Sequence, residues 1–182
     1  MACITPVTAD LAYDCTKRPV KGLKPKAWIF NMNEVTMTYS TNTITNLVKV
    51  TGKTSFTVEG FKDFMNAGSE AVISENFPTV YKHKWTVDSF AATAAERANI
   101  DKADNIIAVV EVNGSQTEGC FLVYGSKNGL WKDAQTQMAN DNNAVTNISF
   151  SSRTGMEEEY SAYVLWKTDY ATTLALLTTS ET

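Results

Sequence analysis

The chain has one histidine, and it is the first candidate for acid–base chemistry. His83 lies between Lys82 and Lys84, in a segment whose alternation is typical of a strand. A catalytic histidine works beside a nucleophile and an acidic group that orients its ring, and no such Ser or Asp is patterned around this position. We therefore interpret His83 as a polar surface or interface residue rather than as a general base.

The other residue types that could do chemistry also lack the spacing that their motifs need. Cys3, Cys15 and Cys120 are far apart and odd in number, which indicates reduced thiols, with Cys120 buried in a strand. Gly52-Lys53-Thr54 matches the end of a phosphate-binding loop, but Leu47 stands where that motif has a glycine. No carboxylate pair stands on a recognisable scaffold. The sequence predicts no enzyme, no cofactor and no metal site.

The strongest pattern that could position functional residues is a helix followed by two strands. N-capping residues and a stripe of alanines predict a helix over residues 88–98, with Ala94 and Ala98 packed against a sheet. A β-branched run predicts a strand over residues 105–112 that is buried on both faces, and a turn leads into a second strand over residues 119–125. We expect the helix to cover one side of this strand pair.

Alternating segments elsewhere predict more strands. Those before the helix cover residues 27–30, 34–40, 43–50, 54–59 and 80–87, and those after it cover residues 145–152 and 160–166. Short turns between the first strands predict an antiparallel meander, and the strand over residues 80–87 has Tyr81, His83 and Trp85 on one face. Residues 133–143 read as a polar connector.

Residues 60–79 interrupt this rhythm and predict a long loop with several large apolar side chains. We expect Phe61, Phe64 and Met65 to bury against another subunit, because so much apolar surface is unfavourable on a free loop. The alternative is that the segment folds back as a local cap or short helix on its own core.

Length and composition are those of one folded domain. The chain has 182 residues, of which 43% are hydrophobic, enough for a core without help from metals or disulfides. No run of eighteen apolar residues occurs, and the first residues lack the pattern of a secretory signal. The sequence therefore predicts neither a membrane span nor secretion.

The net charge of −4 is unevenly distributed along the chain. The first thirty residues carry a net charge of +3, and their cations are Lys17, Arg18, Lys21, Lys24 and Lys26. We interpret residues 1–26 as an extended basic arm that docks on an acidic surface of another copy, and Glu157, Glu158 and Glu159 are a candidate dock. Nucleic-acid contact is the other possibility, but no aromatic residue interleaves the cations before Trp28. A third interpretation is that residues 1–26 are a solvated tail.

Four stretches carry a resemblance to a known family. They are Cys15-Thr16-Lys17-Arg18-Pro19-Val20-Lys21-Gly22 followed by Ala27-Trp28-Ile29-Phe30, Trp85-Thr86-Val87-Asp88-Ser89-Phe90 before the helix, Gly125 with Gly129-Leu130, and Asn142-Asn143-Ala144 before Ile148-Ser149-Phe150-Ser151-Ser152. Together with the order of the elements, they make residues 15–166 similar to the phage tail tube proteins, in particular those of gut bacteriophages.

The resemblance implies a mainly β fold. It is an antiparallel β-sandwich or barrel of the tail tube type, with one flanking α-helix, an extended N-terminal arm and a long loop. The arm would cover residues 1–26, the β domain residues 27–167 with its helix at about 88–98, and a C-terminal tail residues 168–182.

The resemblance also implies a virion structural protein, assembled in the host cytoplasm. Copies of the chain would join into a ring, a hexamer or a dodecamer, and rings would stack into a tail tube or form a neck ring. The other partners would be virion tail or neck proteins. DNA would pass through the channel without specific binding, and no membrane would be involved.

Two other functions fit a β-rich, acidic and cofactor-free chain. One is a head-decoration or receptor-binding β module of a virion. The other is a small ligand-binding β-barrel, whose pocket we would expect around Trp85, Tyr124 and Trp131.

Overall fold

A computed structural model describes residues 22–61, 63–90, 93–114, 116–138 and 145–178. Its strands are β1 (Leu23–Asn31), β2 (Val35–Ser40), β3 (Thr43–Lys49), β4 (Phe56–Glu59), β5 (Met65–Val72), β6 (Val80–Ser89), β7 (Ile106–Val112), β8 (Phe121–Tyr124), β9 (Trp131–Gln137), β10 (Thr146–Ser151) and β11 (Tyr163–Leu165). A 3₁₀ turn, η2 (Met32–Glu34), follows β1, and the helices are α1 (Ala94–Lys102) and α2 (Tyr170–Thr178). The fold is mainly β, as the sequence predicts.

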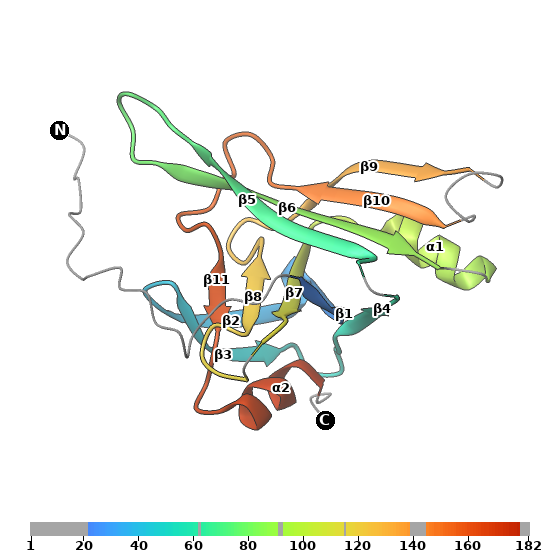
Figure 1. Ribbon diagram of the computed structural model, residues 1–182, viewed down its shortest axis with the longest axis horizontal. Helices are drawn as coiled ribbons and strands as arrows, with labels where there is room; N and C mark the ends of the chain where they lie inside the picture. Colours follow the sequence, from blue (N-terminus) through green and yellow to red (C-terminus); the bar gives the residue numbers. More distant parts are fainter. Residues whose placement is uncertain (1–21, 62, 91–92, 115, 139–144, 179–182) are drawn as a thin grey trace.

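The strands form two sheets that pack face to face. The larger sheet has the order β2-β3-β11-β8-β7-β1-β4, and the smaller has the order β5-β6-β10-β9. Neighbouring strands are antiparallel except β3 and β11, which are parallel. Figure 1 shows the smaller sheet lying across the larger one, with α2 on the other side of the larger sheet. The larger sheet is therefore the middle of three layers.

Strand β7 is the centre of this arrangement because both of its faces are buried. Ile106, Ala108 and Val110 pack between the two sheets with Trp85. Ile107 and Val109 belong to a second core on the opposite face. The predicted burial of this strand on both faces is confirmed, as is its pairing with β8.

The second core includes the C-terminal helix. Thr173 and Leu177 of α2 are fully buried, and Leu177 packs in the same cluster as Trp28 and Phe121. The expected C-terminal tail over residues 168–182 is thus a packed helix in its described part. The described residues form two α-helices, where the sequence predicted one.

The order in which the first strands pair differs from the expected meander. β2 and β3 form a hairpin, but β4 pairs with β1 rather than with β3, and β1 also pairs with β7. Leu23 to Lys26 belong to β1, so these residues of the expected arm are part of the sheet. Residues 1–21 lie outside the described residues.

The helix predicted over residues 88–98 begins later than expected. Asp88 and Ser89 complete β6, where they pair with β10, and Thr93 caps α1 in a reciprocal capping box with Glu96. Ala94 and Ala98 are exposed, so their predicted packing against a sheet is wrong. No residue of α1 is fully buried.

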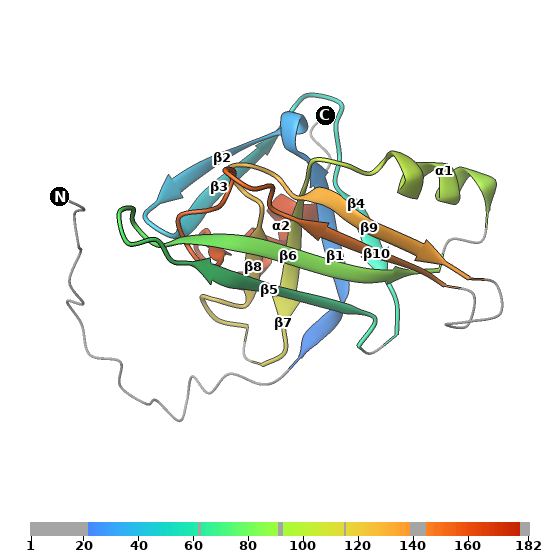
Figure 2. The ribbon, with the colours of Figure 1, turned by 90° about the horizontal axis from the view of Figure 1, so that it is seen from above.

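The expected long loop is a β-hairpin. Strand β5 pairs with β6 over a regular register that runs from Met65 opposite Val87 to Val72 opposite Val80. Only residues 73–79 remain as a connection between the two strands. Figures 1 and 2 show this hairpin extending beyond the rest of the described chain. The polar connector over residues 133–143 also begins as a strand, β9.

Candidate assembly surface

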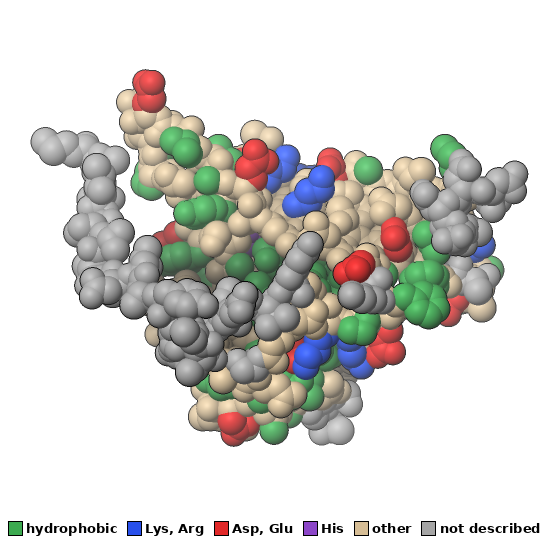
Figure 3. Space-filling model, viewed as in Figure 1, with side chains coloured by type: hydrophobic (Ala, Val, Ile, Leu, Met, Phe, Trp, Pro, Cys, Tyr) green, Lys and Arg blue, Asp and Glu red, His purple; other side chains and the backbone are tan. Residues whose placement is uncertain are grey.

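The end of the β5–β6 hairpin carries apolar side chains that nothing in the described chain covers. The side chain of Ile73 is 82% exposed, and that of Phe77 is 72% exposed. Apolar side chains gather on the projecting part of the hairpin in Figure 3. We call residues 73–79 the hairpin tip. Large apolar side chains that project together mark a contact surface.

The smaller sheet ends in two strands that have a partner on one side only. Among the described residues, β5 pairs only with β6, and β9 pairs only with β10. Strand β5 has eight residues, with no proline, no lysine and no bulge in its register. Natural edge strands normally carry such features to prevent pairing with other chains.

The direction of the free N–H groups of β5 follows from its register. The N–H of Asp88 donates to the carbonyl of Phe64 at 2.8 Å, so these opposed residues form a hydrogen-bonded pair. Such pairs alternate along an antiparallel ladder. Glu70 and Lys82 are therefore also a hydrogen-bonded pair, in which the backbone groups of Glu70 point toward β6. Ser69 lies between two such pairs, so its N–H points away from β6, toward the open edge of β5.

The outer face of the smaller sheet is polar and carries both signs of charge. Glu70 is opposite Lys82 in the register, and Asn147 donates to a carboxylate oxygen of Asp88 at 2.7 Å. A groove on this face is lined by Asn66, Ala67, Gly68, Ser69, Glu70, Lys82, Lys84, Thr86, Asp133 and Ser151. No large apolar side chain lines it.

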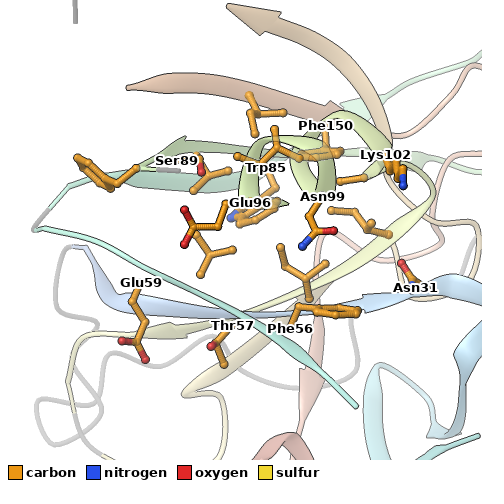
Figure 4. A pocket seen from close by; sticks show the side chains of 18 residues that line it. Asn31, Phe56, Thr57, Glu59, Trp85, Ser89, Glu96, Asn99, Lys102 and Phe150 are labelled. Carbon is orange, nitrogen blue, oxygen red and sulfur yellow. The ribbon is translucent and has the colours of Figure 1, made fainter. Parts of the chain in front are cut away.

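A pocket of about 580 Å³ lies between the two sheets beside α1. In Figure 4, side chains of β4 such as Phe56 face Trp85 and Phe150 across the cavity, and α1 contributes Glu96 and Asn99. Its charged lining residues are Glu59, Glu96 and Lys102. Glu59 pairs with Lys26 at 2.6 Å. The pocket combines an apolar floor with a polar rim, as ligand and peptide sites do.

The predicted ligand pocket forms only in part. Trp85 lines the cavity, but the ring of Tyr124 packs against His83. The guanidinium carbon of Arg153 lies over the ring of Trp131, 3.5 Å from the centre of that ring. Neither Tyr124 nor Trp131 lines the cavity. The structure therefore does not bring these three aromatic residues together around one pocket.

His83 is fully buried, contrary to the expectation of a surface or interface residue. Its Nδ1 accepts a hydrogen bond from the N–H of Gly125 at 3.0 Å, and its Nε2 lies 2.8 Å from the carbonyl of Tyr160. A ring that accepts at one nitrogen and donates at the other is the neutral tautomer. Burial lowers the pKa of His83. Because both nitrogens are engaged, His83 ties the two sheets together and has no free atom for catalysis.

The acidic run has structural roles within its own chain. Glu158 is fully buried, and one of its carboxylate oxygens accepts from the N–H groups of Lys127 and Asn128. Glu159 forms an ion pair with Lys127 at 2.9 Å, and Glu157 accepts from the N–H of Gly155. Glu158 therefore cannot serve as a surface dock for a basic arm, because the turn that it holds covers it.

The described cations of the arm also pair within the chain. Lys24 forms an ion pair with Glu111, which raises the pKa of Lys24, and Lys26 pairs with Glu59. These contacts are made because β1 lies between β7 and β4. Lys17, Arg18 and Lys21 lie outside the described residues, so their docking stays a prediction.

The three predicted interface residues of the long loop differ in their surroundings. Phe64 and Met65 are 5% and 8% exposed and pack in the core between the sheets, so they are core residues. They are buried because β5 begins there and runs beside β6. Phe61 is 77% exposed. Among the described aromatic rings, its ring contacts only that of Phe90, in an edge-to-face arrangement. Its role at an interface stays a prediction.

The described residues contain no group of three or more His, Cys, Asp or Glu side chains that could hold a metal ion. Neither α1 nor α2 has the length and apolar composition needed to cross a lipid bilayer. Comparison with protein-family models, with curated proteins and with solved structures finds no significant match to this chain.

Proposed function

We propose that the chain is a virion structural protein of the tail tube type, which joins copies of itself into a ring around a DNA-conducting channel. Its place would be a phage tail or neck, assembled in the host cytoplasm with other tail or neck proteins. The observation that carries the proposal is that β5 and β9 are the two edge strands on opposite sides of one four-stranded sheet. Asp104 and Asp101, at the end of α1, contact the edge of β9 at Lys132 and Gln135, so β5 has the more open edge of the two. The sequence resemblance to the phage tail tube proteins points the same way.

The direction of the strands suits closure into a ring. All neighbours in the smaller sheet are antiparallel, and the sheet has an even number of strands. If copies are related by rotation about an axis along the strands, β5 of one copy is antiparallel to β9 of the next. Such a head-to-tail interface repeats and closes into a ring when its rotation divides a full turn. The ring would have one continuous antiparallel wall.

The size of such a ring suits a DNA channel. Six copies would contribute about 24 strands to the wall. At a spacing of about 4.8 Å between neighbouring strands, a ring of this circumference has a diameter of roughly 40 Å, and a larger one if the strands are tilted. Twelve copies would enclose roughly twice that width, by the same spacing. The outer face of the smaller sheet would line this channel.

The charges on that face suit passage of DNA without retention. Lys82 and Lys84 are balanced by Glu70, Asp88 and Asp133 on the same face of the sheet. Stable binding to duplex DNA needs several cations that neutralise phosphates together. A face with both signs of charge gives little net attraction, so the duplex would slide along the wall.

A single substitution on the open edge tests the proposal. Ser69→Pro removes an N–H that points away from β6, so β5 keeps its bonds to β6 while the edge loses a donor and gains a bulky ring. We expect a folded monomer with a nearly unchanged melting temperature and few rings in sedimentation and electron microscopy. Ser69→Ala is the matched control and should form rings. Normal rings from Ser69→Pro would contradict pairing through β5.

A further inference from the structure

The pocket between the two sheets has a floor of apolar side chains. Trp85, Val87, Ile106 and Phe150 line it, and each of them is at most 3% exposed. They come from β6, β7 and β10, so both sheets contribute to the floor. The volume of about 580 Å³ lies within the range of about 300–1,000 Å³ that is typical of small-molecule sites. The pocket thus has the size and the lining of a site for a small apolar molecule.

One polar group in this floor has no hydrogen bond. The indole of Trp85 is fully buried, and none of the described residues accepts a hydrogen bond from its Nε1. Figure 4 shows this nitrogen on the side of the cavity that Glu96 borders. A buried N–H without an acceptor is unfavourable, so an oxygen atom of a ligand would be stabilised beside it. The pocket therefore favours a ligand with an oxygen acceptor.

The charges around the pocket favour a neutral ligand. Glu59 is paired with Lys26, and the side chain of Glu96 accepts in the capping box of α1. A ligand carboxylate beside Trp85 would be close to Glu96 and would be repelled by it. A ligand ammonium has no lone pair that could accept from the indole N–H. Lys102 lies in the last turn of α1, where the end of the helix stabilises a cation. A neutral carbonyl oxygen is therefore the acceptor that fits.

We infer that this pocket binds a neutral, apolar small molecule whose carbonyl oxygen accepts a hydrogen bond from Nε1 of Trp85. The apolar body of the ligand packs on Val87, Ile106 and Phe150, which removes its surface from water. All of these residues belong to one copy of the chain, so binding does not require the proposed ring. A failure of the binding test would leave the proposed function untouched, and a chain that forms no rings could still bind the ligand.

The first test asks whether the pocket binds such a molecule. The probe is prodan, a neutral naphthalene with one ketone, whose fluorescence shifts to shorter wavelength in apolar surroundings. The purified full-length chain should bind prodan saturably. Asn99→Trp fills the pocket from the exposed side of α1 and should raise the Kd for prodan by about tenfold or more. Asn99→Ala is the matched control and should bind prodan as the wild type does.

The second test asks whether Trp85 holds the oxygen. 2-Acetylnaphthalene and 2-isopropylnaphthalene have nearly the same shape, but only the first has a carbonyl, and their Kd values follow from competition with prodan. Trp85→Phe keeps an aromatic ring and removes the N–H, so it should weaken binding of the ketone relative to the hydrocarbon by roughly three- to tenfold. Trp131→Phe is the matched control. It removes an indole N–H that also lacks an acceptor among the described residues but lies outside the pocket lining, and it should leave both Kd values unchanged.

A third ligand tests the charge of the occupant. 2-Naphthoate has the shape of 2-acetylnaphthalene but carries a carboxylate, so the wild type should bind it more weakly than the ketone. The inference is overturned if the wild type binds no prodan, if Asn99→Trp binds it as tightly as the wild type, or if 2-naphthoate binds more tightly than the ketone. It is also overturned if a folded Trp85→Phe weakens the ketone and the hydrocarbon equally. If circular dichroism shows that Trp85→Phe does not fold, the Asn99 variants and the comparison with 2-naphthoate decide.

Discussion

The backbone N–H of Gly125 donates to Nδ1 of His83 across 3.0 Å. Because Nε2 of the same ring lies 2.8 Å from the carbonyl of Tyr160, it carries the proton. The ring therefore links β6 of the smaller sheet to the turn after β8 of the larger one. Protonation of Nδ1 would place two N–H groups against each other in a buried site.

This arrangement predicts that stability falls as the medium becomes mildly acidic. Burial lowers the pKa of His83 in the folded state, so the unfolded state takes up its proton first. The neutral ring contributes fully to the free energy of unfolding at a pH above about 6.5, the pKa of histidine in the unfolded state. This contribution is lost as the pH falls from there toward the lower pKa of His83 in the folded state. Melting temperatures measured between pH 7.5 and pH 5.5 should show this decline.

His83→Gln is the control for that measurement. It should melt lower at neutral pH, because one side chain cannot replace both hydrogen bonds, and its melting temperature should change less over the same range. An equal decline in both proteins would show that other groups cause the pH dependence.

Two phenylalanines that are close in sequence should differ sharply in their effect on stability. Phe64→Ala removes a buried side chain between the sheets and should lower the free energy of unfolding by about 3–5 kcal/mol. Phe61→Ala changes an exposed side chain and should alter it by less than about 0.5 kcal/mol. Urea denaturation of the two monomers measures both values, and similar losses would contradict the placement of Phe64 in the core.

Two lysines of β1 should differ in the same way. Lys24 pairs with Glu111, which is 4% exposed, so Lys24→Met leaves a buried carboxylate without its cation and should cost about 1–3 kcal/mol. Lys26 pairs with the exposed Glu59, and Lys26→Met should cost about 0–1 kcal/mol. Equal effects in urea denaturation would mean that the pair with Glu111 has no structural role.

The full chain should not retain duplex DNA. A gel-shift assay at low salt should show no slow band at protein concentrations where assembly is complete, because both signs of charge share the outer face of the smaller sheet. Retardation that weakens steeply as salt increases would indicate a phosphate-binding surface, and would contradict a channel through which DNA slides.

The sequence predicts the strands of the larger sheet and misses β5 and β9, the two edge strands of the smaller sheet. β7 is recognised because its β-branched run fits a strand covered on both faces. β5 has no such pattern, because most of its residues face solvent and only its first residues pack in the core. α2 was missed because its leucines follow threonines, whose side chains fit strands as well as helices.

The candidate assembly surface was predictable only in outline. The apolar residues between 60 and 79 indicate a contact surface. Which of them are buried in the core and which are exposed depends on where β5 begins, and the sequence does not show this. Phe64 therefore lies in the core, while Ile73 and Phe77 reach the tip. The pocket joins β4 to β6 and α1, and its residues are too far apart in sequence to form a pattern.

Negative-stain electron microscopy of the purified full-length chain tests the central claim most directly. If copies join through β5 and β9, the images will show rings of uniform diameter with a continuous wall and an open centre, some of them stacked into tubes. Compact single particles, or trimers without a central channel, at every protein concentration tested would contradict the claim.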